Sequence, residues 1–243
     1  MKPIFQSIRR GFTLVELLVV IAIIAIMMAM AASVLRDPGS GRTLDSGVDM
    51  LTNMIAEARA TAQGNDTYAR LVIASDPSDT SQNSRHLRYA VVQIFRKSES
   101  SGTSDSVEMK GEWVSTSAGA LLPPGIYFSP TYSRALNWAD GAADRLGTTT
   151  TNLSRNKRCK VYYFEFDEKG RYVSPGSSVS APSKPHRIVL INARRAAHGR
   201  DVHDGIIALQ LDSKRLPMSA KGLVIWPNGY TTAMRTHEQI FSR

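Results

Sequence analysis

Apolar residues first gather in a long, nearly uninterrupted run close to the start of the chain. No side chain is polar from residue 17 to residue 32, and within residues 12–35 only Thr13, Glu16 and Ser33 interrupt the run. As an α-helix this segment would extend roughly 36 Å, which exceeds the hydrocarbon core of a bilayer at about 30 Å. We therefore predict a transmembrane helix over residues 12–35.

A second apolar pattern, with helical spacing, follows a break in the chain. Residues 37–41 include Pro38 and two glycines, which end or kink a helix. Beyond them apolar residues recur at steps of three and four, and Gly64 is well placed as a C-cap. We predict an amphipathic helix over residues 42–64 whose apolar stripe packs on a sheet. The stripe comprises Leu44, Val48, Leu51, Ile55, Ala58 and Ala62.

The rest of the chain alternates short β-prone segments with polar, Ser-rich loops. One pair of segments flanks the turn at residues 167–170, and another flanks Asn228-Gly229, the strongest short signal for a hairpin. A helix followed by many strands is typical of the α+β class. We predict an α+β fold in which the helix packs on an antiparallel, β-rich domain over residues 65–243. The predicted strands cover residues 68–74, 87–96, 112–116, 126–129, 161–166, 172–173, 187–191, 206–211, 223–226 and 230–234.

The segment before the apolar run, residues 1–11, is short and basic. It contains Lys2, Arg9 and Arg10 and no acidic residue, a bias that keeps it in the cytoplasm and directs the following chain outward. Glu16 is the exception inside the run, because a carboxylate in lipid is costly and needs a partner. These features predict a single-pass protein of the inner membrane with its C-terminal domain in the periplasm or outside the cell, and they make Glu16 a functional candidate.

The junction between leader and run, Gly11 followed by Phe12-Thr13-Leu14-Val15-Glu16, resembles the type IV prepilin signal for cleavage and N-methylation. The resemblance implies that prepilin peptidase cuts after Gly11 and methylates the new amino group of Phe12. It also implies that Glu16 pairs with the terminal amine of a neighbouring subunit in a filament. Such pairing removes much of the cost of burying either charge alone.

Two export signals compete with this interpretation. Arg9-Arg10 followed by apolar residues is similar to a twin-arginine signal, and Ala29-Met30-Ala31 is similar to the cleavage site of a secretory signal peptide. An export signal has no use for Glu16, however, and the apolar run is longer than the 7–15 residues typical of a signal peptide. The pattern therefore favours prepilin processing.

Later segments resemble the minor pseudopilins of the FimT/GspH type. The resemblance is carried by residues 55–62, with their Ala-Arg-x-x-Ala stretch before the first strand, by the strand and turn at 166–171, and by the final Gly-containing hairpin. It implies a structural subunit of a type II secretion pseudopilus or type IV pilus, with prepilin peptidase and other pilin or pseudopilin subunits as partners. The rival hypothesis is a membrane-anchored binding module or enzyme.

Candidate catalytic and metal sites are weak in this sequence. No P-loop, G-x-S-x-G or G-x-G-x-x-G occurs, and Cys159 is the only cysteine, so no intramolecular disulfide is expected. His198 and His203 could be drawn as metal ligands, but their spacing does not suit one helix face and favours a solvated loop. We expect no enzyme activity, no cofactor and no metal.

Basic residues suggest one alternative function. The formal net charge is +9, which favours anionic neighbours without choosing among nucleic acid, lipid and acidic protein. If the strands bring the basic residues of the second half together, they form a patch that could capture DNA, an activity known of some FimT-like pilins, through salt-sensitive phosphate contacts. Solvated loop charges or contacts to an acidic subunit are the favoured interpretation. The candidate patch comprises Arg187, Arg194, Arg195 and Arg200, with a second cluster at Arg155, Lys157, Arg158 and Lys160.

Overall fold

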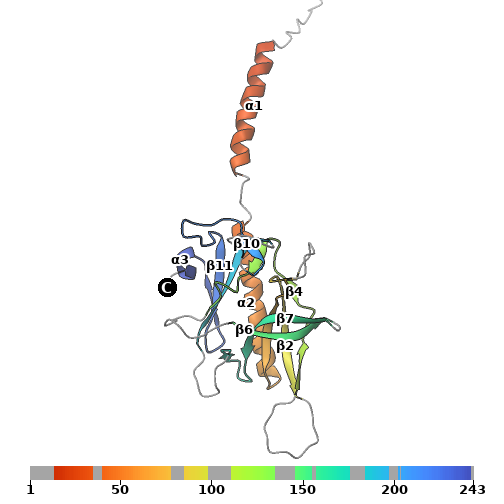
Figure 1. Cartoon of the computed structure of the whole chain (residues 1–243). Helices are drawn as coiled ribbons and strands as arrows, with labels where there is room; N and C mark the ends of the chain where they lie inside the picture. The colour runs from red at the N-terminus through yellow and green to blue at the C-terminus, as the bar shows by residue number, and fades with distance from the viewer. Residues whose placement is uncertain are drawn as a thin grey trace, which may run out of the picture. The chain divides into compact units, whose positions relative to one another are not determined.

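The computed structural model describes residues 14–34, 40–77, 85–97, 111–134, 146–154, 157–175, 184–196, 202 and 204–241. The chain divides into two units, Met1–Gly39 and Ser40–Arg243, each described here by itself (Figure 1). The second unit holds one helix and twelve strands among its described residues, together with a short C-terminal helix. All the strand pairs are antiparallel, so the fold belongs to the α+β class.

The first unit contains α1, Leu14–Val34. This helix consists almost entirely of apolar residues and has no polar face. Its described side chains, from residue 14 to residue 28, are exposed. Residues 12, 13 and 35 of the predicted transmembrane helix lie outside the described residues. Among the residues that the structure does describe, we find no helix with both the length and the apolar content needed to traverse a bilayer.

The second unit is built around α2, Ser40–Gly64. It begins two residues before the predicted start and ends at the predicted glycine. All six residues of the predicted stripe are buried, and Gly47 lies where an added Cβ would press on Leu190 of a facing strand. Burial of this stripe, at about 25 cal/mol per Å² of apolar surface, supplies much of the free energy that holds the helix to the strands.

The larger sheet has seven strands in the order β3-β2-β1-β7-β6, with β4 beside β2 and β8 beside β7. The β7–β8 pair meets across residues 167–171, as the sequence predicted. Strand β6, a run of threonines, was missed because it lacks the apolar alternation of a half-buried strand. The strands are β1 Ala69–Ala74, β2 Tyr89–Lys97, β3 Gly111–Ser115, β4 Ala120–Leu121, β6 Gly147–Ser154, β7 Lys157–Phe166 and β8 Tyr172–Val173.

The smaller sheet has five strands in the order β10-β9-β11-β12, with β5 beside β9. The predicted Asn-Gly hairpin is present as β11 and β12, and the short helix α3, His237–Phe241, follows it. The sequence predicted a sheet under the long helix, whereas α2 contacts both sheets, and they share one core cluster with it (Figure 1). The strands are β5 Ile126–Phe128, β9 His186–Arg195, β10 Ile206–Ala208, β11 Ala220–Ile225 and β12 Thr231–Met234.

The outer face of the larger sheet carries a buried cation. Arg70 of β1 is 4% exposed and donates from Nε and Nη2 to Oε1 of Gln93 on β2, at 3.1 and 2.9 Å. Its guanidinium carbon lies 3.9 Å from the ring centroid of Trp113 on β3. Thr151 of β6 closes over this group, within 3.3 Å of the Gln93 amide nitrogen. Burial lowers the pKa of Arg70 to about 10, so the side chain stays charged at neutral pH.

Candidate functional site

The acidic residue of the N-terminal signal lies at the start of α1. Glu16 lies in the first turn of the described part of this helix, which starts at Leu14. Its neighbours are apolar, and Leu14 is 80% exposed. The two other predicted site residues of this signal, Gly11 and Phe12, lie outside the described residues.

The apolar surface of α1, taken by itself, is large and continuous. Exposed apolar side chains surround the helix from Leu14 to Met28, with Glu16 as the one ionisable group among them. A surface of this kind in water is strongly unfavourable, because each buried CH₂ group is worth about 0.8 kcal/mol. The helix is therefore stable only where apolar groups cover this surface.

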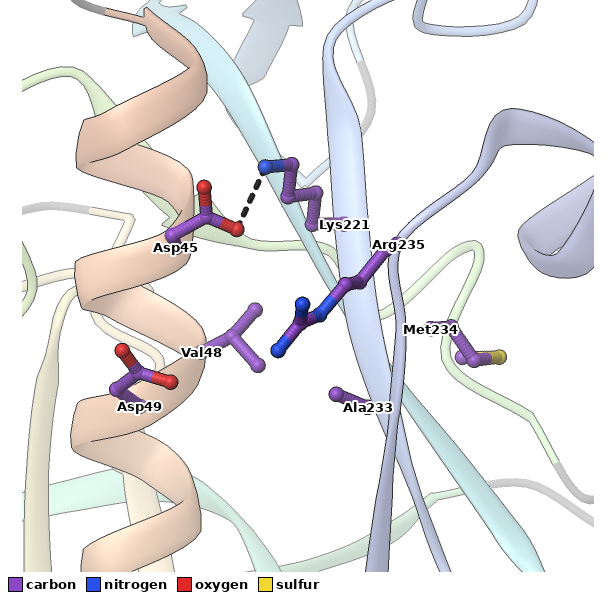
Figure 2. A pocket seen from close by; sticks show the side chains of 7 residues that line it. All are labelled: Asp45, Val48, Asp49, Lys221, Ala233, Met234 and Arg235. Carbon is purple, nitrogen blue, oxygen red and sulfur yellow. Dashed lines mark hydrogen bonds and ion pairs between the residues drawn. The ribbon is translucent and has the colours of Figure 1, made fainter.

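A pocket of about 290 Å³ lies in the second unit between α2 and the β11–β12 hairpin. Figure 2 shows Asp45 and Asp49 on one wall, facing Lys221 and Arg235 on the other. The two aspartates flank Val48, which belongs to the buried stripe, so helical spacing places them at the rim of the helix–sheet contact. Apolar side chains, Val48, Ala233 and Met234, complete the lining.

The four charges of this pocket are only partly paired. Lys221 Nζ lies 2.5 Å from Asp45 Oδ1 and 3.3 Å from the carbonyl oxygen of Gly41. The Arg235 guanidinium extends toward α2 beside Val48 (Figure 2). Within the described residues the side chains of Asp49 and Arg235 have no hydrogen bond or ion pair. The pocket thus presents one carboxylate and one guanidinium, on opposite walls, to whatever enters it.

The structure places three residues of the candidate basic patch, Arg187, Arg194 and Arg195, on β9. Arg187 donates to the carbonyl oxygen of Ile240 in α3, and burial, with a smaller contribution from Arg134, lowers its pKa. Arg195 donates from Nη2 to the carbonyl oxygen of Pro77 at 2.7 Å, whereas Arg194 is exposed. Arg200 lies outside the described residues. The patch was predicted from sequence spacing alone, which does not show that backbone carbonyls engage two of its arginines.

The second basic cluster belongs to the other sheet. Lys157, Arg158 and Lys160 lie on β7 of the seven-stranded sheet, whereas the patch arginines lie on β9 of the five-stranded sheet. The loop after β1 contacts both regions: Arg195 donates to the carbonyl oxygen of Pro77, and the backbone N–H of Ser75 donates to the carbonyl oxygen of Lys160. The two clusters therefore do not share a sheet face.

Other predicted residues have simpler outcomes. His198 and His203 lie outside the described residues, so the loop interpretation stays a prediction.

The pocket charges were missed, although Asp45 and Asp49 are spaced i, i+4 beside the apolar stripe and could have drawn attention. Lys221 and Arg235 carry no such local signal, because only strand pairing places them opposite α2.

Comparison with known proteins identifies the N-terminal signal. Residues 7–32 match the prokaryotic N-terminal methylation motif. No curated protein and no solved structure matches the chain. The chain therefore carries a prepilin-type signal, which includes Gly11, Phe12 and Glu16 and which supports membrane anchoring through the N-terminus. Prepilin peptidase and pilin subunits are the general class of partner that such a signal implies.

Proposed function

We propose, from the prepilin-type signal, that the chain is a pilin-like structural subunit whose N-terminal helix builds a filament. The match over residues 7–32 carries this proposal. The position of Glu16 in the sequence supports it, because the carboxylate belongs to the fifth residue of a chain that begins at Phe12. The continuous apolar surface of α1 supplies the packing surface, and the β-rich unit is the part displayed outside the filament core.

The proposed mechanism has three steps. Prepilin peptidase removes residues 1–11 and methylates Phe12 while the N-terminal segment anchors the subunit in the inner membrane. The helix then leaves lipid for the apolar surfaces of neighbouring helices, an exchange with little net hydrophobic cost. Finally Glu16 pairs with the terminal amine of a neighbour, which compensates two charges that would each cost several kcal/mol if buried alone.

At a finer level we propose a minor pseudopilin of the FimT/GspH type, in a type II secretion pseudopilus or type IV pilus. One support is the stretch Ala58-Arg59-x-x-Ala62, which lies near the C-terminal end of α2 and precedes β1 in the chain. The other is the presence of the two hairpins, β7–β8 and β11–β12. The guanidinium carbon of Arg59 lies 4.0 Å from the ring centroid of Tyr230 in the β11–β12 hairpin, so these two segments contact one another. We further propose that the domain lies in the periplasm or outside the cell and has no enzyme activity.

The experiment is replacement of the signal's carboxylate. Glu16→Ala removes a charge that disfavours lipid insertion, so membrane insertion and leader cleavage are expected to persist. Incorporation into filaments is expected to fall sharply, because the neighbour's amine loses its partner. Pull-down of the other pilin subunits with a tagged chain measures incorporation, and Ser33→Ala, at the other end of the same run, is the control. Wild-type yields of co-purified pilins with Glu16→Ala would refute the proposal.

A further inference from the structure

The pocket between α2 and the β11–β12 hairpin holds two charges that have no partner among the described residues. Asp49 and Arg235 lie on opposite walls, over an apolar lining that includes Val48 and Met234 (Figure 2). Lys221 is already neutralised by Asp45 at 2.5 Å. A fitting occupant therefore presents a carboxylate for Arg235 and an ammonium or guanidinium group for Asp49, side by side.

A turn at the other end of α2 has this chemistry. Glu168 and Lys169 are adjacent, exposed residues between β7 and β8. Within the described part of the chain their side chains have no ion pair. The turn thus offers a carboxylate and an ammonium next to each other.

The turn is held rigidly. Asp167 Oδ1 accepts hydrogen bonds from the backbone N–H groups of Lys169 and Arg171, at 3.0 and 2.8 Å. The carbonyl oxygen of Lys169 accepts a bond from Gln63 Nε2 of α2 at 3.0 Å. Gly170, with φ of 70°, makes the turn possible. Because the turn is fixed before binding, docking it would cost little conformational entropy.

The pocket and the turn lie along the same side of one helix. From Asp49 to Gln63 the helix advances about 21 Å and rotates to within about 40° of the starting direction. The β11–β12 hairpin runs between them, since Lys221 lines the pocket and Pro227 accepts a hydrogen bond from Tyr172 beside the turn. A copy shifted only along α2 would overlap the first, so a second copy that docks its turn in this pocket has to approach from outside this side of the helix. Such a contact joins two different surfaces, and so it is heterologous and does not use one patch on both copies.

We propose that the pocket is a docking site for the β7–β8 turn of a second copy of this chain, with Arg235 pairing to Glu168 and Asp49 pairing to Lys169. This inference rests on the proposed role as a filament subunit and names the surface through which the β-rich units contact one another. It differs from the Glu16 contact, which belongs to the N-terminal helix.

The test is thiol crosslinking with a short bis-maleimide between two full-length chains with different tags, co-expressed in membranes in a Cys159→Ser background. One chain carries Asp49→Cys and the other carries Lys169→Cys. The spacer of the reagent makes up for the length of the paired Asp49 and Lys169 side chains, which a direct disulfide could not bridge. Each chain has one cysteine, so any tagged heterodimer is a contact between copies. The control replaces Asp49→Cys by Ala60→Cys, which is exposed on the same face of α2 but lies about 16 Å from the pocket.

We expect the Asp49→Cys pair to crosslink at least about fivefold more than the Ala60→Cys control. Adding Arg235→Glu to the pocket chain should lower the yield by about the same factor, and adding Glu168→Arg to the turn chain as well should restore it. A yield equal to that of the control, or one that the charge reversals leave unchanged, would overturn the inference.

These outcomes are separable from failure of the proposed function. If the pocket does not crosslink while co-purification with pilins still depends on Glu16, only the docking inference is wrong. If Glu16→Ala has no effect on that co-purification, the filament role itself is wrong.

Discussion

The buried cation Arg70 offers the sharpest test of how the larger sheet is stabilised. Arg70→Leu removes two charge-assisted hydrogen bonds to Gln93, at 3.1 and 2.9 Å, and the stacking on Trp113. It also leaves the Gln93 side chain, which is 0% exposed, with only the hydroxyl of Thr151 and the carbonyl of Asn152 as partners among the described residues.

The expected loss follows from these contacts. Hydrogen bonds to a charged group are worth about 1.5–3 kcal/mol, and a desolvated cation–π contact is worth up to about 2 kcal/mol. Removal of the Arg70 desolvation cost and the added apolar burial of leucine offset part of this sum. We expect the free energy of unfolding to fall by about 3 kcal/mol at neutral pH.

The loss should depend on pH through Glu165, which is paired with Arg70 in the β1–β7 register. Burial raises the pKa of Glu165, and the charge of Arg70 opposes that rise. Without Arg70 the pKa rises further, so the folded variant binds a proton more tightly than the unfolded chain does. Stability then falls as pH rises above the ordinary glutamate value near 4.5. The difference between wild type and Arg70→Leu should therefore be larger at pH 7 than at pH 5.

Urea unfolding, followed by tryptophan fluorescence, would measure both effects in a chain that begins at Ser40. This segment is suitable because every residue of the core cluster lies between Leu44 and Ile240. The matched control adds Glu165→Gln to Arg70→Leu, which should recover part of the loss and abolish its pH dependence. A destabilisation under about 0.5 kcal/mol would refute the reasoning, since that is the usual range of a surface substitution. A loss equal at pH 5 and pH 7 would refute the part assigned to Glu165.

Two further predictions concern a turn and the basic arginines. Gly229→Ala should lower stability by about 2 kcal/mol or more, because Gly229 has φ of 80° and a Cβ would collide with the carbonyl oxygen of Gly170. Urea unfolding measures this, with Gly64→Ala, where a Cβ meets no atom, as the near-neutral control; equal stabilities would contradict it. Because Arg187 and Arg195 bond to backbone carbonyls, duplex DNA should bind no tighter than about 10⁻⁶ M at physiological salt. Tighter, salt-sensitive binding that Arg194→Glu/Arg195→Glu abolishes would show that the DNA alternative is correct.

The sequence predicted those elements whose signals are local. The stripe from Leu44 to Ala62 has a helical period and a glycine at its end, and α2 occupies that stretch. The turns at Gly170 and Gly229 depend on positive φ, which glycine adopts readily, and both hairpins are present.

What the sequence did not predict depends on contacts between distant strands. Thr148 and its neighbours in β6 have no apolar alternation, and their place comes from pairing with β7. The burial of Arg70 has no local signal, because it depends on the hydrogen bonds to Gln93 of β2 and on the ring of Trp113 of β3. In the pocket, Asp49 and Arg235 are far apart in the chain and become neighbours only when β12 packs near α2.

The mass of the mature N-terminal peptide tests the central claim most directly. The chain is purified from membranes of cells that contain prepilin peptidase, and its N-terminal peptide is identified by mass spectrometry. We expect it to begin at Phe12 and to carry one methyl group on its amino nitrogen. A chain that retains Met1, or one that begins at Ala32 after cleavage as a secretory signal peptide, would contradict the account.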